Sequence, residues 1–133
     1  MIRKSVESHV REELIDISGI VEDVVRDAAF DEGICIVYTP HTTAALTINE
    51  NTDPAVRSDL IAILAGIIPR SARYHHQEGN SDAHAKASLI GSSVIVPIES
   101  GKPALGTWQG IMFCEFDGPR KRQIFIQLIS AVS

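Results

Sequence analysis

Apolar and polar side chains alternate along the first ten residues, and this pattern predicts a half-exposed strand there. A helix should follow Ser18-Gly19, because apolar residues then recur at helical spacing, and it should end before Gly33. The apolar positions of the strand are Ile2, Val6 and Val10, and those of the helix are Ile20, Val21, Val24, Val25 and Ala28.

The middle of the chain predicts two more strands and a second helix. The β-branched run 34–38 is bounded by glycine and proline, which is typical of a buried strand. Another strand should follow Thr43. Asp53 is then a suitable N-cap, and Pro54 suits the first helical position, where its missing N–H is not needed. We expect this helix to end at Pro69. Its apolar stripe consists of Val56, Leu60, Ile63, Leu64 and Ile67.

The rest of the chain predicts a short helix that begins with Ser81 as its N-cap. A strand over 94–98 should follow. The last third resembles a hairpin, in which strands 111–117 and 122–129 are joined by the turn 118–121. We therefore expect one domain over residues 1–133, of α+β class, with a mostly antiparallel sheet and two to three packed helices.

Composition narrows the classes of function. The chain is 44% hydrophobic but only 5% aromatic, so its core should be aliphatic. A net charge of −5 argues against a nucleic-acid partner, which needs a clustered basic surface. The segment Arg120-Lys121-Arg122 is interpreted as a solvated turn or, second, as an anion site. The first residues lack the apolar segment of a secretory leader, and no apolar stretch is long enough to span a membrane. We expect a cytoplasmic protein without a membrane partner.

Three of the five histidines lie in the segment 74–84, among mostly polar residues. If Ser81 caps its helix, His84 lies in the first turn, where the positive end of the helix dipole favours a neutral imidazole. A neutral histidine suits a metal ligand or a general base, and the free N–H groups of that turn suit a phosphate. His76 is the expected partner of His84, whereas His75 should point elsewhere. Solvated loop histidines and a helix-capping role are the alternatives. A third metal ligand could be His41, Asp82 or Glu50.

Further polar groups flank the strand that follows Thr43. Asn49-Glu50-Asn51 comes at its end, so these residues need not touch His41-Thr42 within one subunit. Each group is either a turn or part of a site for a polar ligand. Trp108, the only tryptophan, either fills a packing gap or stacks on a planar ligand whose edge Gln109 contacts. Glu115 lies in the middle of an apolar strand and needs solvent or a partner.

Together these segments resemble the YjbQ family, also named UPF0047, some of whose members are labelled secondary thiamine-phosphate synthase. The resemblance extends from about Ser18 to the C-terminus. It rests on Thr39-Pro40-His41-Thr42-Thr43, Asn49-Glu50-Asn51 with Asp53-Pro54, Tyr74-His75-His76 leading to Ala83-His84, Gly106-Thr107-Trp108-Gln109, and Glu115 with Gly118-Pro119-Arg120.

The resemblance implies a homotrimer with polar sites near the subunit boundaries. It also implies a reaction, in which a hydroxymethylpyrimidine diphosphate and a thiazole phosphate give thiamine phosphate and diphosphate. The leading hypothesis is therefore a transferase that acts on a small phosphorylated metabolite, with His76, His84 and Glu50 as catalytic residues. The residues expected to bind substrate are Thr42, Asn49, Asn51, Thr107, Trp108, Gln109, Glu115 and Arg120.

A divalent metal, zinc or magnesium, is the expected cofactor, with His41, His76 and His84 as its ligands. The rival hypothesis is a trimer that binds a small metabolite or a metal without catalysis.

Overall fold

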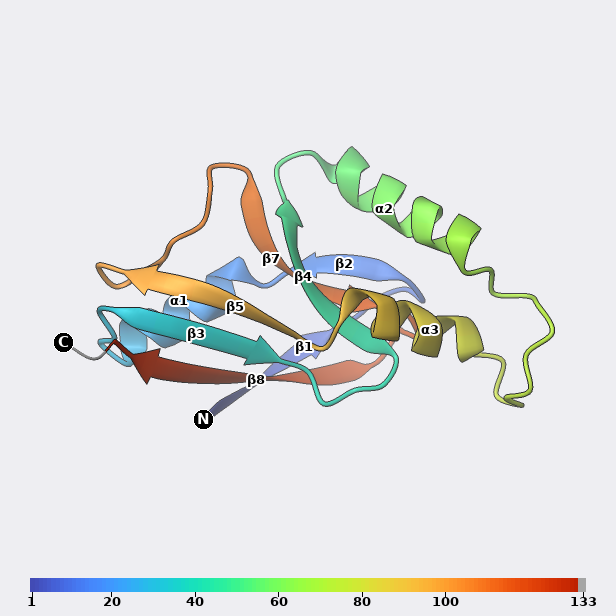
Figure 1. The fold of residues 1–133 in the computed structure, drawn as a ribbon, viewed down its shortest axis with the longest axis horizontal. Helices are drawn as coiled ribbons and strands as arrows, with labels where there is room; N and C mark the ends of the chain where they lie inside the picture. Colours follow the sequence, from blue (N-terminus) through green and yellow to red (C-terminus); the bar gives the residue numbers. More distant parts are fainter. Residues whose placement is uncertain (132–133) are drawn as a thin grey trace.

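The computed structural model describes residues 1–131, which form two antiparallel sheets and three helices (Figure 1). The first sheet has the order β1 (Ile2–Glu7), β8 (Lys121–Ser130), β3 (Gly33–Tyr38), β5 (Ser93–Glu99) and β6 (Lys102–Pro103). The second has the order β2 (Glu13–Asp16), β7 (Gln109–Glu115) and β4 (Ala44–Glu50). The helices are α1 (Ser18–Asp27), α2 (Pro54–Ile67) and α3 (Ser81–Ile90). The α+β class, the antiparallel pairing and the three helices confirm the predicted fold class.

The main core lies between the two sheets and α1, and it is mostly aliphatic as expected. Val37 and Ile126 of the first sheet and Leu46 of β4 belong to the same buried cluster as Val25 of α1. A smaller cluster lies on the other face of β4, where Ala45 packs with Ala83 of α3. Both faces of β4 are covered. The residues that precede and follow this strand in the sequence can therefore reach solvent only at its two ends.

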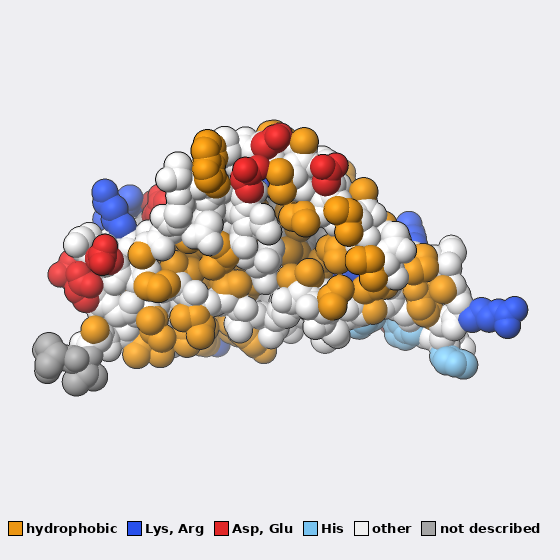
Figure 2. All heavy atoms as spheres, turned by 45° about the horizontal axis from the view of Figure 1, so that its top comes forward, with side chains coloured by type: hydrophobic (Ala, Val, Ile, Leu, Met, Phe, Trp, Pro, Cys, Tyr) orange, Lys and Arg blue, Asp and Glu red, His pale blue; other side chains and the backbone are white. Residues whose placement is uncertain are grey.

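The predicted helices α1 and α2 are confirmed, and so is the cap of α2. The Asp53 side chain accepts a hydrogen bond from the Ala55 N–H at 2.9 Å, and Pro54 occupies the first turn. No residue of α2 is fully buried, and Ile63 and Ile67 are 56% and 64% exposed. Figure 2 shows many exposed hydrophobic side chains on the face of the molecule that it presents. Among residues 1–131, no helix is long and apolar enough to cross a membrane.

The predicted hairpin of the last third is wrong. Both of its strands exist, but β7 pairs with β2 and β4, whereas β8 pairs with β1 and β3. A strand has only two hydrogen-bonding edges, and both edges of β7 are already occupied, so β8 has no edge to join. The segment between them instead carries the chain from one sheet to the other.

Two local predictions also need correction. Ser81 is the first residue of α3 and not its N-cap, because Asn80 occupies the cap position. The first strand ends at Glu7, and Val10 is 53% exposed. There the Ser8 N–H donates to the Arg120 carbonyl at 3.0 Å, after which the chain turns into β2, a strand that the sequence pattern did not predict.

Candidate functional site

A cavity of about 440 Å³ opens where the β3–β4 connection, the start of α3 and the β7–β8 connection meet. The three elements bring distant parts of the chain together: His41 comes from the first, His84 from the second and Arg120 from the third. The cavity contains both imidazole and guanidinium groups. Its wall is formed chiefly by His41, Thr42, His76, Glu78, Asn80, His84, Asp117, Arg120 and Arg122.

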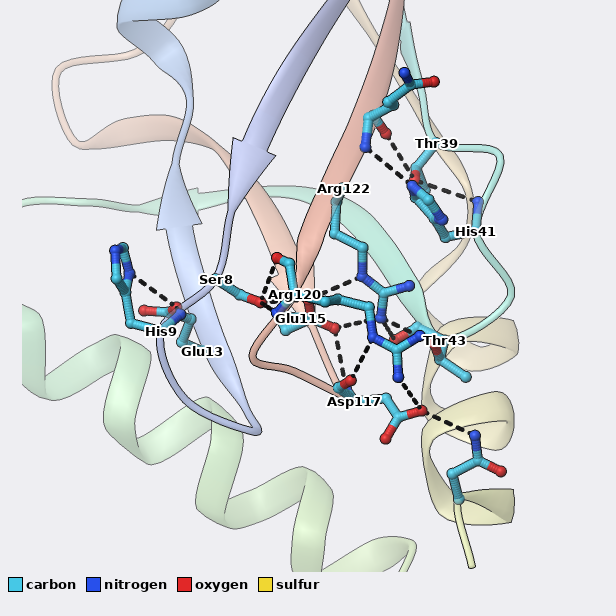
Figure 3. A network of polar contacts seen from close by, with 12 residues as sticks. Ser8, His9, Glu13, Thr39, His41, Thr43, Glu115, Asp117, Arg120 and Arg122 are labelled. Atoms are coloured by element: carbon cyan, nitrogen blue, oxygen red, sulfur yellow. Dashed lines mark hydrogen bonds and ion pairs between the residues drawn. The ribbon is translucent and has the colours of Figure 1, made fainter. Parts of the chain in front are cut away.

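His41 is held in its neutral form. Its Nε2 accepts a hydrogen bond from the Gln123 N–H at 2.9 Å, which requires an unprotonated Nε2 (Figure 3). Burial lowers the pKa of His41, and the positive charges of Arg122 and Arg120 lower it further, against an opposing effect of Glu115. The neutral ring leaves the proton on Nδ1, so His41 offers a donor there and no free Nε2 lone pair.

His76 and His84 lie against each other in an edge-to-face arrangement. Their ring centroids are 5.4 Å apart and the ring planes meet at 89°. Nε2 of His76 lies 3.7 Å from a carboxylate oxygen of Glu78, and the His76 side chain is 43% exposed. The predicted pairing of these two histidines is therefore present, with His76 at the open side of the cavity.

Behind the cavity, Arg122 and Glu115 form a buried ion pair. Glu115 accepts hydrogen bonds from Arg122 Nε at 2.9 Å, from Arg122 Nη2, and from the Ser8 hydroxyl at 2.7 Å (Figure 3). Burial raises the pKa of Glu115, but the bonds from Arg122 and Ser8 outweigh it and leave the pKa below its usual value. Arg122 Nη2 also donates to the Thr43 hydroxyl at 2.9 Å. Both charges are therefore fixed in position.

Nη1 of Arg122 takes no part in this network. Within residues 1–131, the hydrogen bonds of the Arg122 guanidinium involve only Nε and Nη2. Asn80 Oδ1 is the only buried side-chain polar atom without a partner in this part of the chain, so the unbonded Nη1 keeps a small exposed area, although Arg122 as a whole is only 2% exposed. A rigid guanidinium with one free donor at a cavity wall is suited to hold an anion.

Arg120 forms a second, more exposed pair. Its Nε donates to the Asp117 carbonyl at 2.9 Å, and its Nη2 donates to the Asp117 carboxylate at 3.1 Å. Asn80 Nδ2 donates to the same carboxylate at 2.8 Å. Asp117 therefore joins the start of α3 to the β7–β8 connection, and it holds Arg120 at the rim of the cavity.

The position of α3 is set by a cluster of charges on the helix face away from the cavity. Asp82 and Lys86 are fully buried and lie 3.1 Å apart. Arg11 binds Asp82 at 3.0 Å, and Lys86 also binds Glu12 at 3.2 Å. Burial raises the pKa of Asp82, but bonds from Arg11 and Lys86 leave it lowered. Because both of its oxygens are engaged, Asp82 is not available as the third metal ligand.

A second polar group lies at the other end of β4. Glu50 pairs with Gln109 in the β4–β7 register, and the Asn51 N–H donates to the Trp108 carbonyl at 3.0 Å. Asn51 Nδ2 donates to Asp16 at 2.9 Å. The Trp108 side chain is 60% exposed, so it does not fill a packing gap within this subunit. The strand separates this group from the histidines by roughly 20 Å.

The family model described as "UPF0047 protein YjbQ-like" matches residues 3–131. The chain belongs to the YjbQ/UPF0047 family. It is 46% identical to the UPF0047 protein MJ1081 of Methanocaldococcus jannaschii, over 97% of this chain and 94% of that protein. It is 45% identical to the UPF0047 protein YugU of Bacillus subtilis, over 90% and 91% of the two chains.

Solved structures agree with this assignment. An uncharacterized YjbQ/UPF0047 protein of Clostridium acetobutylicum superimposes with a TM-score of 0.95 at 47% identity, covering 97% of this chain and 100% of that one. A conserved hypothetical protein of Thermus thermophilus gives a TM-score of 0.91 at 36% identity, with 97% and 100% covered. The family and its fold are therefore established for this chain.

Within this YjbQ-family chain, the predicted site residues separate into two groups. His41, Thr42, His76, His84 and Arg120 line one cavity. Glu115 lies behind that cavity, bound to Arg122. The remaining predicted residues lie at the far end of β4 or beside it; these are Asn49, Glu50, Asn51, Thr107, Trp108 and Gln109. Glu50 therefore does not meet the histidines within one chain.

Sequence reasoning missed Glu78, Asn80 and Asp117 as cavity residues, and it named Arg122 only within the segment 120–122, whose second interpretation was an anion site. Arg122 had a usable signal, since it shares the inward face of β8 with Ile124 and Ile126. A charged residue at a core position needs a buried partner, and Glu115 is the matching acid on an apolar strand. Asn80 and Asp117 offered no such signal, because isolated polar residues in loops are common.

The residues expected to bind a metal, His41, His76 and His84, fit that role only in part. As placed, no three His, Cys, Asp or Glu side chains among residues 1–131 form a group that could hold a metal ion. His76 and His84 are close enough to act together as two ligands. Nε2 of His41 instead faces the backbone of Gln123.

Proposed function

We propose that the cavity binds a small phosphorylated metabolite and that its histidines provide acid–base chemistry. The observation that carries this proposal is the fixed Arg122 guanidinium, which has an unbonded Nη1 and belongs to a residue lining the same cavity as Arg120, His76 and His84. Arginine donors suit phosphate oxygens, and imidazoles change protonation near neutral pH. The proposal includes a cytoplasmic location, which suits two buried free cysteines, Cys35 and Cys114.

The specific reaction that we propose is thiamine-phosphate synthase-like coupling. The thiazole nitrogen would form a bond to the pyrimidine methylene carbon while the bond from that carbon to diphosphate breaks. The electron pair leaves with the diphosphate, whose added charge needs cationic stabilisation. Arg120 and Arg122 would bind the departing phosphates, and His84 would donate a proton to them. His41, neutral at Nε2, would donate from Nδ1 and orient the ligand.

A divalent metal would be the alternative to the proton of His84, with His76 and His84 as its protein ligands. Zinc or magnesium would neutralise phosphate charge there. His41 would join them only if its Nε2 left the Gln123 N–H. This proposal is separate from the anion site itself, because the two arginines bind an anion with or without the ion.

The test is pyrimidine–thiazole coupling, measured with and without added divalent metal, in wild type and in His84→Ala. We expect the rate to fall at least about 100-fold, the usual contribution of a positioned acid or base. His75→Ala is the matched control, because His75 is exposed and does not line the cavity. Coupling that survives His84→Ala would remove His84 from the mechanism.

The second candidate function is binding without catalysis. It is favoured by the charge balance of the cavity, because Arg120 is paired with Asp117 and Arg122 is paired with Glu115. Little net positive charge is then left to stabilise a departing diphosphate. If wild type shows no coupling but binds phosphate through Arg122, this function replaces the first. Calorimetric titration of wild type and Arg122→Met with inorganic phosphate would decide the point, because binding through Arg122 should be lost in the variant.

We also propose that the chain forms a homotrimer, as the family resemblance implies. The exposed Ile63 and Ile67 of α2 support self-association. Assembly would allow Glu50, which is remote from the histidines of its own chain, to approach those of a neighbour. Light scattering on the purified 14.5 kDa chain should then give three times that mass, whereas a monomer would leave Glu50 without a catalytic role.

A further inference from the structure

A short connection behind the cavity is bound to two of its walls at once. Residues 8–12 join β1 to β2, and none of them lines the cavity. The first of the two walls is the start of α3, which carries His84, and the second is the β7–β8 connection, which carries Arg120. The separation of these walls determines the space that a ligand must fit.

Ser8, at the start of this connection, is bound to the β7–β8 wall. Its N–H donates to the Arg120 carbonyl at 3.0 Å, and its hydroxyl accepts from the Arg120 N–H at 2.9 Å (Figure 3). A Cβ added at Gly118 would lie 2.6 Å from the Ser8 hydroxyl and 2.5 Å from the Val10 carbonyl oxygen. The two connections are therefore packed without a gap, so a shift of one displaces the other.

Arg11, near the end of the connection, is bound to both walls. Its carbonyl accepts a hydrogen bond from the Gly118 N–H at 2.9 Å. Its guanidinium donates to both oxygens of the Asp82 carboxylate, from Nη2 at 3.0 Å and from Nη1 at 3.3 Å. Two bonds of this kind fix an orientation as well as a distance. Because Asp82 and His84 belong to the same turn of α3, the His84 ring moves with the Asp82 carboxylate.

We propose that Arg11 is a positioning residue that fixes the distance between His84 and Arg120 without contacting the ligand. Its guanidinium holds α3, and its carbonyl holds the β7–β8 connection, so one residue joins both walls. Lysine cannot replace it, because an ammonium group is a point charge and does not make two parallel bonds to one carboxylate. The inference rests on the proposed function, since the wall separation matters only if the cavity binds a ligand that contacts both walls.

A second link joins the same two walls, but it is more exposed. Asn80 Nδ2 donates to the Asp117 carboxylate at 2.8 Å. The Asp117 side chain is 19% exposed, whereas the Asp82 side chain is fully buried. Water can replace a partner of an exposed carboxylate, but a buried carboxylate that loses its partner stays unsatisfied. Arg11 therefore holds the two walls together more firmly than Asn80 does.

The test compares inorganic phosphate with pyrophosphate by calorimetry, on the full chain of wild type and of Arg11→Lys. A single phosphate can bind to Arg120 and Arg122, which both lie on the β7–β8 side. Pyrophosphate is longer, and its second phosphate should extend across the cavity toward His84. Arg11→Lys should weaken pyrophosphate binding about tenfold, the effect of one hydrogen bond to a charged group, and should not change phosphate binding. A loss of stability alone would affect both ligands equally, so the ratio of the two affinities measures the position of α3.

Two further variants complete the test. Arg26→Lys is the matched control, because Arg26 pairs with Asp23 on α1 and does not line the cavity. Asp82→Asn keeps the shape of its side chain but weakens the same pair from the α3 side, so it should also lower pyrophosphate affinity selectively. Either Arg11→Lys or Asp82→Asn is sufficient for the comparison if the other does not fold.

Each outcome bears on the inference. A selective loss of pyrophosphate affinity in Arg11→Lys or Asp82→Asn, with both affinities kept in Arg26→Lys, supports it. Equal losses for the two ligands, or no loss for either, overturn it and leave the proposed function intact. A selective loss in Arg26→Lys, or a wild type that binds phosphate but not pyrophosphate, also overturns it. If wild type binds neither ligand, the proposed function fails first, and the inference fails with it.

Discussion

The two ends of β4 carry polar groups of different kinds. At the Ala44 end, histidines and arginines surround cavities, and the charge of Arg122 is supported by its buried partner Glu115. At the Glu50 end, amides and carboxylates bond one another near the surface, as Asn51 does with Asp16. The first end has donors that remain free for a ligand, whereas the second end uses its polar groups to connect backbone segments. The two ends therefore differ in whether their polar groups are left free for a ligand.

The largest expected effect is at the buried pair of the cavity end. Glu115→Gln should lower the free energy of unfolding by about 3 kcal/mol, because it leaves Arg122 charged, mostly buried and without its counter-ion. Asn51→Ala, at the other end, should cost only about 1–2 kcal/mol, since it removes one hydrogen bond. Urea unfolding measures both.

If the two substitutions cost the same, the proposed difference between the two ends is wrong. A useful second control is Asp117→Asn, which breaks the more exposed pair with Arg120. It should cost less than about 1 kcal/mol, because solvent screens that pair.

A medium effect is expected from close packing at the other end of β4. A Cβ added at Gly110 would lie 2.7 Å from Cβ of Asn51, so one of the two strands must move. Gly110→Ala should therefore destabilise by about 1–3 kcal/mol. In Gly66→Ala the added methyl meets open space on a helix, and it should stabilise by about 0.5–1 kcal/mol.

The double variant Gly110→Ala with Asn51→Gly isolates the contact. Removing the Asn51 side chain removes the clashing atoms. The double variant should therefore lose less unfolding free energy than the two single variants lose in sum. Additive effects would show that the contact does not determine the spacing of these strands.

The sequence predicted most elements of this fold because their patterns are local. Run 34–38, the cap at Asp53 and the helix of α1 depend on neighbouring residues, and all three are confirmed. The pairing of β7 and β8 was predicted wrongly because short separation favours a hairpin, while the competition from β2 and β4 comes from distant segments. Local chemistry cannot rank such partners.

The candidate site was predicted in part for the same reason. The histidine-rich segment was visible, and His76 and His84 do lie together. Arg122 was grouped with a turn, since its inward direction depends on where β8 joins the first sheet. Placing Glu50 beside the histidines required a contact across the length of β4, which the chain does not make by itself.

The smallest effect that we expect is the pH dependence of His41. Burial and the arginines lower its pKa in the folded chain, so the unfolded chain binds this proton more readily. The corresponding stability is fully present above the unfolded pKa of about 6.5 and is lost as pH falls through the lower folded pKa. Protonated Nε2 can no longer accept from the Gln123 N–H. Wild type should therefore lose stability between about pH 7.5 and 5.5, by less than about 1 kcal/mol from this group.

His41→Gln should reduce this dependence, whereas His75→Gln, at an exposed position, should keep it. Thermal unfolding at the two pH values measures the difference, and this range stays above the ordinary carboxylate pKa values. An unchanged dependence in His41→Gln would mean that the cavity end owes its pH sensitivity to another group.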